Sequence, residues 1–177
     1  MAVRPVLKMG HPLLRQVAAP VGRFDVLQMN ELLTDMEDTM RVLHGAGIAA
    51  PQIGVSQRVV IFELGENPRY PHITPIPFTV LINPKLEPLG AEMEEGWEGC
   101  LSVPGLRGVV PRYRRLRYSG LDREGEFFER TVEGFHARVV QHEVDHLDGV
   151  LFPQRVSDMT RFGFEDELVG QMVPTPD

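Results

Sequence analysis

The chain has 177 residues and a formal net charge of −7, so it is long enough for one well-formed core, and its acidic balance argues against direct nucleic-acid binding. A single cysteine excludes an internal disulfide framework and is typical of a reducing compartment. Because the first residues lack the apolar stretch of a signal peptide and no apolar run is long enough to span a membrane, we expect a cytoplasmic protein with no membrane partner.

The first predicted element is a long N-terminal helix over residues 25–44. Its apolar residues recur at alternating four- and three-residue steps, which is the period of one helix face. These residues are Met29, Leu33, Met36, Met40 and Leu43. Asp25 is the expected N-cap, and Gly45 and Gly47 are expected to end the helix.

Strands are predicted in the middle of the chain, followed by a second helix. The strand candidates are apolar or alternating runs, and residues 122–125 form a turn signal between the last two. They cover residues 58–62, 78–82, 106–121 and 126–133. The second helix is expected over about 134–148 and is closed by Gly149. Strands grouped between two helices predict an α+β fold rather than alternating βαβ units.

The segment from His142 to His146 reads H-E-x-x-H and carries the strongest chemical signal. Residues four apart share one helix face, so the two imidazoles can bind the same metal ion. Glu143 lies beside that face, where a carboxylate can take a proton from a water molecule. This pattern is typical of metal-assisted hydrolysis of an amide or ester.

The third metal ligand distinguishes three classes of enzyme. An extended metzincin pattern would place a histidine where the chain has Phe152, which cannot bind a metal. Glu165 is a thermolysin-like alternative, although glycine and proline residues interrupt the chain between it and the histidines. Cys100 lies in a glycine-flanked segment, and one cysteine with two histidines leaves a fourth position open for catalysis. On the residues alone, Cys100 remains balanced against a small buried hydrophobic side chain.

Three segments together resemble the motifs of peptide deformylases. Residues 45–52 read GAGIAAPQ, residues 98–102 read EGCLS, and residues 141–146 read QHEVDH, in the family's order. Ala46 is smaller than the apolar residue that the family usually has at that position. Each motif is short, but their joint occurrence is specific.

The resemblance implies a fold, an activity and a partner. The expected α+β fold has mostly antiparallel strands packed around a central helix that carries H-E-x-x-H, with a single catalytic domain over residues 1–177. The expected reaction removes the formyl group from the N-terminal formyl-methionine of newly made polypeptides and releases formate, after a metal-bound water attacks the formyl carbon. A transient contact of the enzyme with the ribosome is compatible with this reaction.

The resemblance also assigns roles to residues of this chain. By motif position the metal ligands are Cys100, His142 and His146. Glu143 is the general acid and base, while Gln52 and the backbone N–H of Leu101 stabilise the oxyanion. The family uses one divalent ion, Fe²⁺ in the cell, which Zn²⁺, Ni²⁺ or Co²⁺ can replace.

Residues that contact the peptide are harder to identify. Gly47 and Gly99 are candidates because glycine permits close approach of a peptide backbone. Val139 and Phe135 precede His142 by three and seven residues and therefore face the metal side of the helix. They can line an apolar pocket for the methionine side chain, or they belong to ordinary core packing.

Charged residues near the motifs have a structural interpretation. Glu98 and Asp145 are expected to orient the ligating histidines, as carboxylates commonly do. Arg107 and Arg112 follow the cysteine motif and can contact a peptide or pair with an acidic residue, but each taken alone is expected to be a solvated surface charge. Arg138, four residues before His142, either turns outward or meets the peptide.

Overall fold

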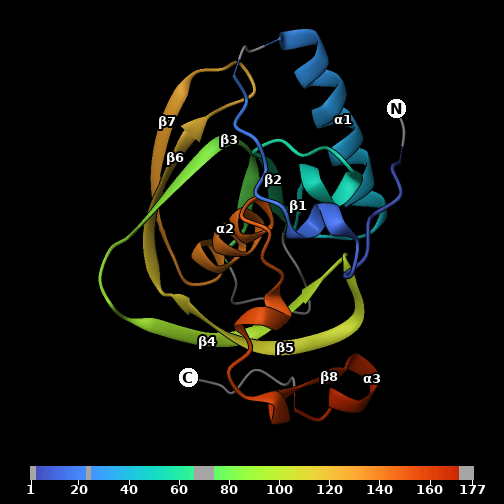
Figure 1. Ribbon diagram of the computed structural model, residues 1–177. Helices are drawn as coiled ribbons and strands as arrows, with labels where there is room; N and C mark the ends of the chain where they lie inside the picture. The colour runs from blue at the N-terminus through green and yellow to red at the C-terminus, as the bar shows by residue number, and fades with distance from the viewer. Residues whose placement is uncertain (1–2, 23–24, 66–73, 172–177) are drawn as a thin grey trace.

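The computed structural model describes residues 3–22, 25–65 and 74–171 and has an α+β architecture, as expected (Figure 1). Its strands form a five-stranded sheet of order β1-β2-β3-β6-β7 and a three-stranded sheet of order β4-β5-β8, both antiparallel. The strands are β1 Gly47–Ala49, β2 Val59–Leu64, β3 Ile76–Pro88, β4 Met93–Cys100, β5 Val103–Tyr113, β6 Arg115–Leu121, β7 Phe127–Glu133 and β8 Phe162–Phe164. The α-helices are α1 Val26–Val42, α2 Gly134–Leu147 and α3 Glu165–Leu168, and the 3₁₀ helices are η1 Pro12–Arg15, η2 Ala50–Ile53, η3 Phe152–Arg155 and η4 Met159–Arg161.

The helix α1 begins where the sequence predicts but ends differently. The side chain of Asp25 accepts hydrogen bonds from the first free N–H groups of the helix, which confirms it as the N-cap. At the other end His44, and not a glycine, adopts the left-handed conformation with φ 55°. Its N–H donates to the carbonyl of Arg41, and the N–H of Gly45 donates to that of Met40, which together make a Schellman motif.

The predicted strand over 106–121 is two strands in different sheets. The chain leaves β5 at Tyr113, and Arg114 lies between the sheets. Val110 and Arg112 are buried at alternate positions near the end of β5, and the same alternation resumes in β6, so periodicity cannot reveal the break. The hairpin that joins β6 to β7 is as predicted: Asp122 accepts backbone hydrogen bonds from Glu124 and Glu126.

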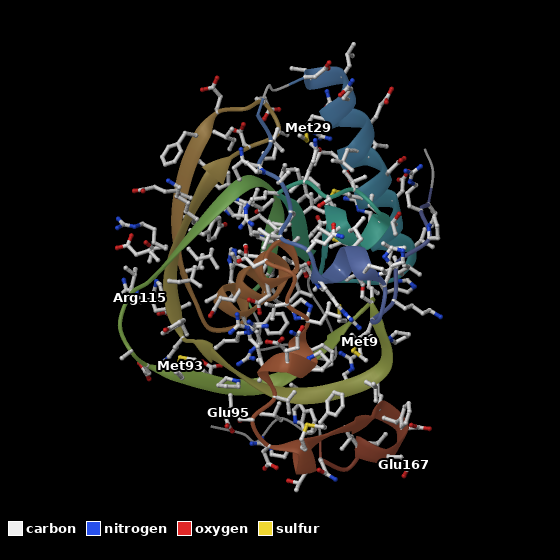
Figure 2. The ribbon with its side chains drawn as sticks, viewed as in Figure 1. Met9, Met29, Met93, Glu95, Arg115 and Glu167 are labelled. Carbon is white, nitrogen blue, oxygen red and sulfur yellow. The ribbon has the colours of Figure 1, made fainter. Side chains whose placement is uncertain are left out.

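Both faces of the five-stranded sheet are buried, and strand alternation explains how. In β2, Val60 and Phe62 pack in a cluster that includes residues of α2, whereas Val59 and Ile61 pack in a second cluster with residues of α1. The helix α2 contacts strands of both sheets, and side chains fill the space around it (Figure 2). The five-stranded sheet therefore separates α1 from α2.

The helix α2, unlike α1, ends as predicted. Gly149 adopts φ 73°, its N–H donates to the carbonyl of His146, and the N–H of Val150 donates to that of Asp145. A Cβ on Gly149 would lie 2.7 Å from the backbone of Arg15, so this position requires glycine for space as well as for conformation. No helix in the described ranges is long and apolar enough to cross a membrane.

Candidate active site

The fold brings the three motifs together around α2. Cys100 ends β4, Gln52 lies in η2, and the two histidines lie one turn apart on α2. Donor atoms of Cys100, His142 and His146 all lie within 4.8 Å of one another. The Sγ atom of Cys100 is 3.3 Å from Nε2 of His146, and His142 uses its Nδ1 for Glu98, so its Nε2 remains for a metal. This donor set fits one tetrahedral ion with a fourth position open.

The pKa of the Cys100 thiol lies well below its ordinary value. Burial alone would raise that pKa, but the imidazoles of His146 and His142 lie beside the sulfur and lower it. The thiolate is the form of cysteine that binds metals. The environment of Cys100 therefore suits a metal ligand better than an inert buried thiol.

Glu143 is buried immediately beside this cluster. Burial raises the pKa of its carboxyl group to about 7, although the nearby imidazoles of His142 and His146 act in the opposite direction. Its Oε2 atom has no hydrogen-bond partner among the described residues. A carboxylate with these properties can accept a proton near neutral pH and return it.

Gln52 is held in one orientation with its amide nitrogen toward Cys100. Its side chain is 1% exposed, and its Oε1 accepts a hydrogen bond of 2.8 Å from the N–H of Ala49. The Nε2 atom donates to Oγ of Ser102 at 3.0 Å and lies 3.6 Å from Sγ of Cys100. Leu101 directly follows Cys100 in the turn before β5. Sequence reasoning missed Ser102, although its place two residues after the candidate ligand was a signal.

Glu98 has all its acceptor sites filled. Arg112 donates to both oxygens at 2.9 Å, Arg138 donates to Oε1 at 2.9 Å, and Nδ1 of His142 lies 2.8 Å from Oε2. Burial would raise the pKa of Glu98, but hydrogen bonds from Arg112 and His142 hold it well below its usual range. Glu98 therefore stays ionised and fixes the ring of His142.

Two arginines correct the sequence interpretation. Arg112 is not a solvated surface charge but is 3% exposed, and it pairs with Glu98 and Asp145, in agreement with the alternative of an acidic partner. The available signal was its position two residues after Val110 on the same buried strand face. Arg138 turns neither outward nor toward a peptide, because its guanidinium donates to Glu98 and to backbone carbonyls of β4 and β5. Arg155 completes the network by pairing with Asp145, and no pattern in the sequence indicated it.

The four candidate substrate residues occupy two different settings. Gly47 lies on β1 against Glu143, and the guanidinium of Arg107 lies over Gly99, 2.6 Å from where a Cβ would be. Val139 is buried in the cluster between α2 and the sheet, and Phe135 packs against that cluster. Gly47 is therefore adjacent to Glu143, the space beside Gly99 is occupied by Arg107, and Val139 and Phe135 belong at least partly to the core.

The metzincin position, which holds Phe152, and the alternative ligand Glu165 both lie outside the donor group. Phe152 stacks on the ring of His142 with 6.3 Å between centroids and an interplanar angle of 23°. Glu165 is half exposed and pairs with Arg107 at 3.3 Å. Neither joins the donor group of Cys100 and the two histidines.

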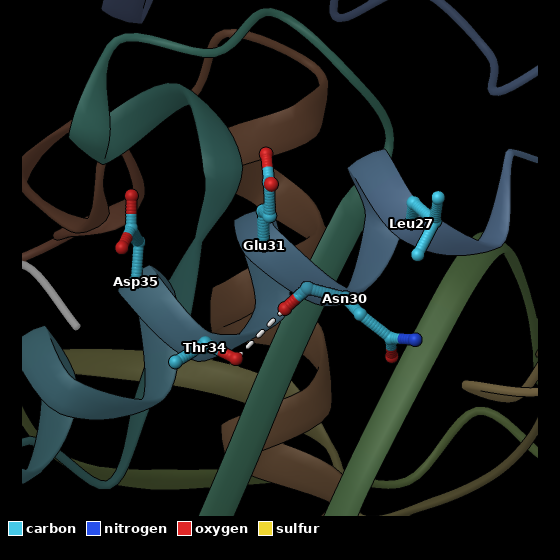
Figure 3. A pocket seen from close by; sticks show the side chains of 5 residues that line it. All are labelled: Leu27, Asn30, Glu31, Thr34 and Asp35. Atoms are coloured by element: carbon cyan, nitrogen blue, oxygen red, sulfur yellow. Dashed lines mark hydrogen bonds between the residues drawn. The ribbon is translucent and has the colours of Figure 1, made fainter.

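A hollow on α1 has no connection to this chemistry (Figure 3). It is lined by Leu27, Asn30, Glu31, Thr34 and Asp35, all from one helix. The hydroxyl of Thr34 donates to the carbonyl of Asn30, as it would on any helix surface. None of the motif residues lines it.

Comparison with known proteins identifies the family. The profile of polypeptide deformylase matches residues 3–162. The chain belongs to the polypeptide deformylase family. Peptide deformylase 1 of Nitrosomonas europaea is 60% identical over 166 residues, which is 94% of this chain and 94% of that protein. Peptide deformylase 2 of Ralstonia nicotianae is 59% identical over 170 residues, covering 96% of each chain.

A solved deformylase structure agrees with the fold. The class I type b peptide deformylase from Acinetobacter baumannii, in a crystal structure bound to Met-Ala-Ser, matches with a TM-score of 0.84 and 43% identity. The match covers 88% of this chain and 99% of that one. The protein is therefore an enzyme of the deformylase family, which acts on the N-terminal formyl group of peptides.

Proposed function

We propose that this deformylase is a metal-dependent hydrolase that removes the formyl group from the formyl-methionine of newly made polypeptides and releases formate. The observation that carries the proposal is the convergence of Cys100, His142 and His146 beside a buried Glu143. We also propose that residues 1–177 act as one catalytic domain in the cytoplasm, where nascent chains carry the formyl group. A transient contact with the ribosome would fit this role.

The proposed metal is a single divalent ion, Fe²⁺ in the cell, with Zn²⁺, Ni²⁺ or Co²⁺ as replacements. Cys100, His142 and His146 would hold it through one sulfur and two nitrogens, a donor set that suits these ions. When bound, such an ion makes a water molecule acidic enough to supply a nucleophile at neutral pH and polarises the formyl oxygen.

The chain's own residues supply the proton transfer and the charge stabilisation. Glu143 takes the proton of the attacking water and returns it to the amine that leaves. Gln52 has two amide hydrogens; one bonds Ser102, and the other, which is directed at Sγ of Cys100, is the proposed donor to the formyl oxygen. The backbone N–H of Leu101 is the second proposed donor. Each such donor contributes about 2.7–4 kcal/mol to transition-state stability in other hydrolases.

The proposed peptide path follows the outer edge of β1. This strand pairs with β2 through one side, and the carbonyl of Ala46 accepts from Glu63 there. By alternation the N–H and C=O of Gly47 point to the other side, where an extended peptide can add as a strand. Gly99 would face the same peptide, and Phe135 and Val139 would contact the methionine side chain. The A. baumannii relative bound to Met-Ala-Ser supports a peptide ligand of this kind.

The direct test is formate release from formyl-Met-Ala-Ser, compared with formyl-Ala and with unformylated casein, by the metal-loaded protein and by Glu143→Ala. The proposal predicts formate from the formyl-methionyl peptide alone, and its loss in the variant. Cleavage of casein would indicate an endopeptidase instead. Absence of formate release at full metal occupancy would contradict the proposal.

A further inference from the structure

Gly47 has no side chain, and the side chain of Glu143 occupies the space where one would lie. A Cβ built on Gly47 would lie 2.6 Å from Cδ and 2.8 Å from Cγ of Glu143, and Oε1 of the same carboxylate would also be in contact. Distances below 3.0 Å are essentially never seen for real Cβ atoms. All three nearest atoms belong to Glu143, so the contact is specific to this pair.

Backbone conformation does not explain the glycine. Gly47 lies in β1 opposite Phe62, and it is not among the residues with positive φ. Any residue can adopt its backbone angles, so the requirement for glycine is steric. The glycine at this position thus differs from Gly149, whose φ of 73° itself disfavours a side chain.

Glu143 has little freedom to yield to a larger neighbour. It is buried on α2, between the two histidines of the donor group. Because the contact includes Cγ, rotation of the terminal carboxylate alone cannot relieve it. A methyl group at residue 47 would therefore move the whole side chain by about 1 Å to restore ordinary contact distances.

We propose that Gly47 is a positioning residue for Glu143: its lack of a side chain sets how close the carboxylate lies to the edge of β1. The inference rests on the proposed function, in which Glu143 transfers the proton and the peptide adds to that edge. Gly47 then has two roles: its backbone groups bind the peptide, and the space left by its missing side chain holds the carboxylate of Glu143. This places the formamide of the substrate next to the carboxylate.

The kinetic test is Gly47→Ala in the nickel-loaded enzyme with formyl-Met-Ala-Ser. We expect kcat to fall by about 100-fold, which is typical of a displacement of about 1 Å, while KM and metal content stay within twofold. Gly22→Ala is the matched control, because a Cβ there would meet nothing within 4 Å. An unchanged kcat, with or without a raised KM, would overturn the inference by showing that Gly47 acts through the peptide alone.

A stability measurement separates this inference from the proposed function. Gly47→Ala should lower Tm by about 5 °C in the wild-type background and by less than about 2 °C in the Glu143→Ala background, where the obstacle is gone. Folding of Gly47→Ala only in that second background would support the inference equally. An equal drop in both backgrounds would overturn it. This comparison needs no activity, so it remains decisive even if the wild-type enzyme released no formate.

Discussion

Nδ1 of His142 donates a hydrogen bond of 2.8 Å to the carboxylate of Glu98, which reaches it from the neighbouring strand β4. The direction follows because an ionised carboxylate can only accept. The bond fixes the tautomer of His142, so the other nitrogen carries the lone pair that a metal needs. The remaining acceptor sites of Glu98 are taken by Arg112 and Arg138.

Glu98→Gln should therefore weaken metal binding. The amide keeps the shape of the carboxylate but loses its charge. Its NH₂ group would also face N–H donors of Arg112, Arg138 or His142, where an acceptor is needed. We expect a 10- to 100-fold rise in the dissociation constant for Zn²⁺, about the cost seen when such outer partners are changed. Competition with a chromophoric chelator measures it. Glu92→Gln, in an exposed pair with Arg114, should leave the constant unchanged. Equal affinity in all three proteins would contradict the role of Glu98.

Cys100→Ala should remove the metal. Two imidazoles alone hold a divalent ion weakly, so metal per chain after dialysis should fall from near one to near zero. Metal analysis of the folded variant checks this. His136→Gln is the control, because His136 is on α2 but outside the donor group, and it should retain the metal. Retention of metal by Cys100→Ala would exclude the cysteine as a ligand.

The iron-loaded enzyme should lose activity in air. Both Fe²⁺ and a thiolate ligand oxidise, whereas Ni²⁺ and Co²⁺ are more resistant to oxygen at such a site. We expect activity to decline during aerobic storage of the iron form and to persist in the nickel form. Parallel assays of anaerobic and aerobic samples measure the difference. Identical decay of the two metal forms would mean that oxidation of the centre is not the cause.

Arg138→Met should destabilise the fold. Its guanidinium joins α2 to β4 and β5, and removal would leave Glu98 and the buried carbonyl of Val110 short of a donor. Breaking a buried pair of this kind costs about 3–5 kcal/mol of unfolding free energy. Urea denaturation provides the measurement. Arg117→Met, in an exposed pair with Glu87, is the matched control and should change the free energy little.

His136 should make stability depend on pH. Burial, with a smaller contribution from Arg130, lowers its pKa from 6.5 to about 4 in the folded protein. The unfolded chain therefore binds the proton first, and stability is lost as pH falls from 6.5 to 4, by at most about 1.4 kcal/mol per pH unit. The difference in unfolding free energy between wild type and His136→Gln across this range isolates the effect. A constant difference would refute it.

The ends of the two long helices offer a paired test. His44→Gly should raise Tm by about 2–4 °C, because a left-handed conformation costs about 1 kcal/mol for a residue with a Cβ. Gly149→Ala should lower Tm for two reasons. An alanine is strained at the φ of 73° that Gly149 adopts, and its methyl group would clash with the backbone of Arg15. Thermal unfolding followed by circular dichroism measures both. A lower Tm for His44→Gly would show that the imidazole itself stabilises this helix end.

Much of the candidate site follows from local sequence. The spacing of His142 and His146 fixes their shared face through the helical period alone, and Gly149 ends that helix because only glycine fits there. Asp25 begins α1 for an equally local reason, since its side chain reaches N–H groups two and three residues ahead. Such features depend on neighbours within one or two turns.

Strand partners were beyond the reach of periodicity. β4 contains three glutamates and two glycines among its eight residues, so it has no apolar alternation to reveal it. It is a strand because it pairs with β5 along its length, with Trp97 opposite Val109. The break at Arg114 was hidden for a related reason. Alternation indicates which residues of a strand are buried, but it does not indicate to which sheet the strand belongs.

The sequence by itself identified the candidate reacting groups, because two candidate metal-ligating histidines and a carboxylate lie within five consecutive residues of one helix. Only the tertiary structure decided what surrounds them. It placed Cys100 against His146, buried Arg112 and Arg138 around Glu98, and set Gly47 against Glu143. Each of these contacts joins residues more than a dozen positions apart. Their geometry depends on how sheets and helix pack, which no short-range period encodes.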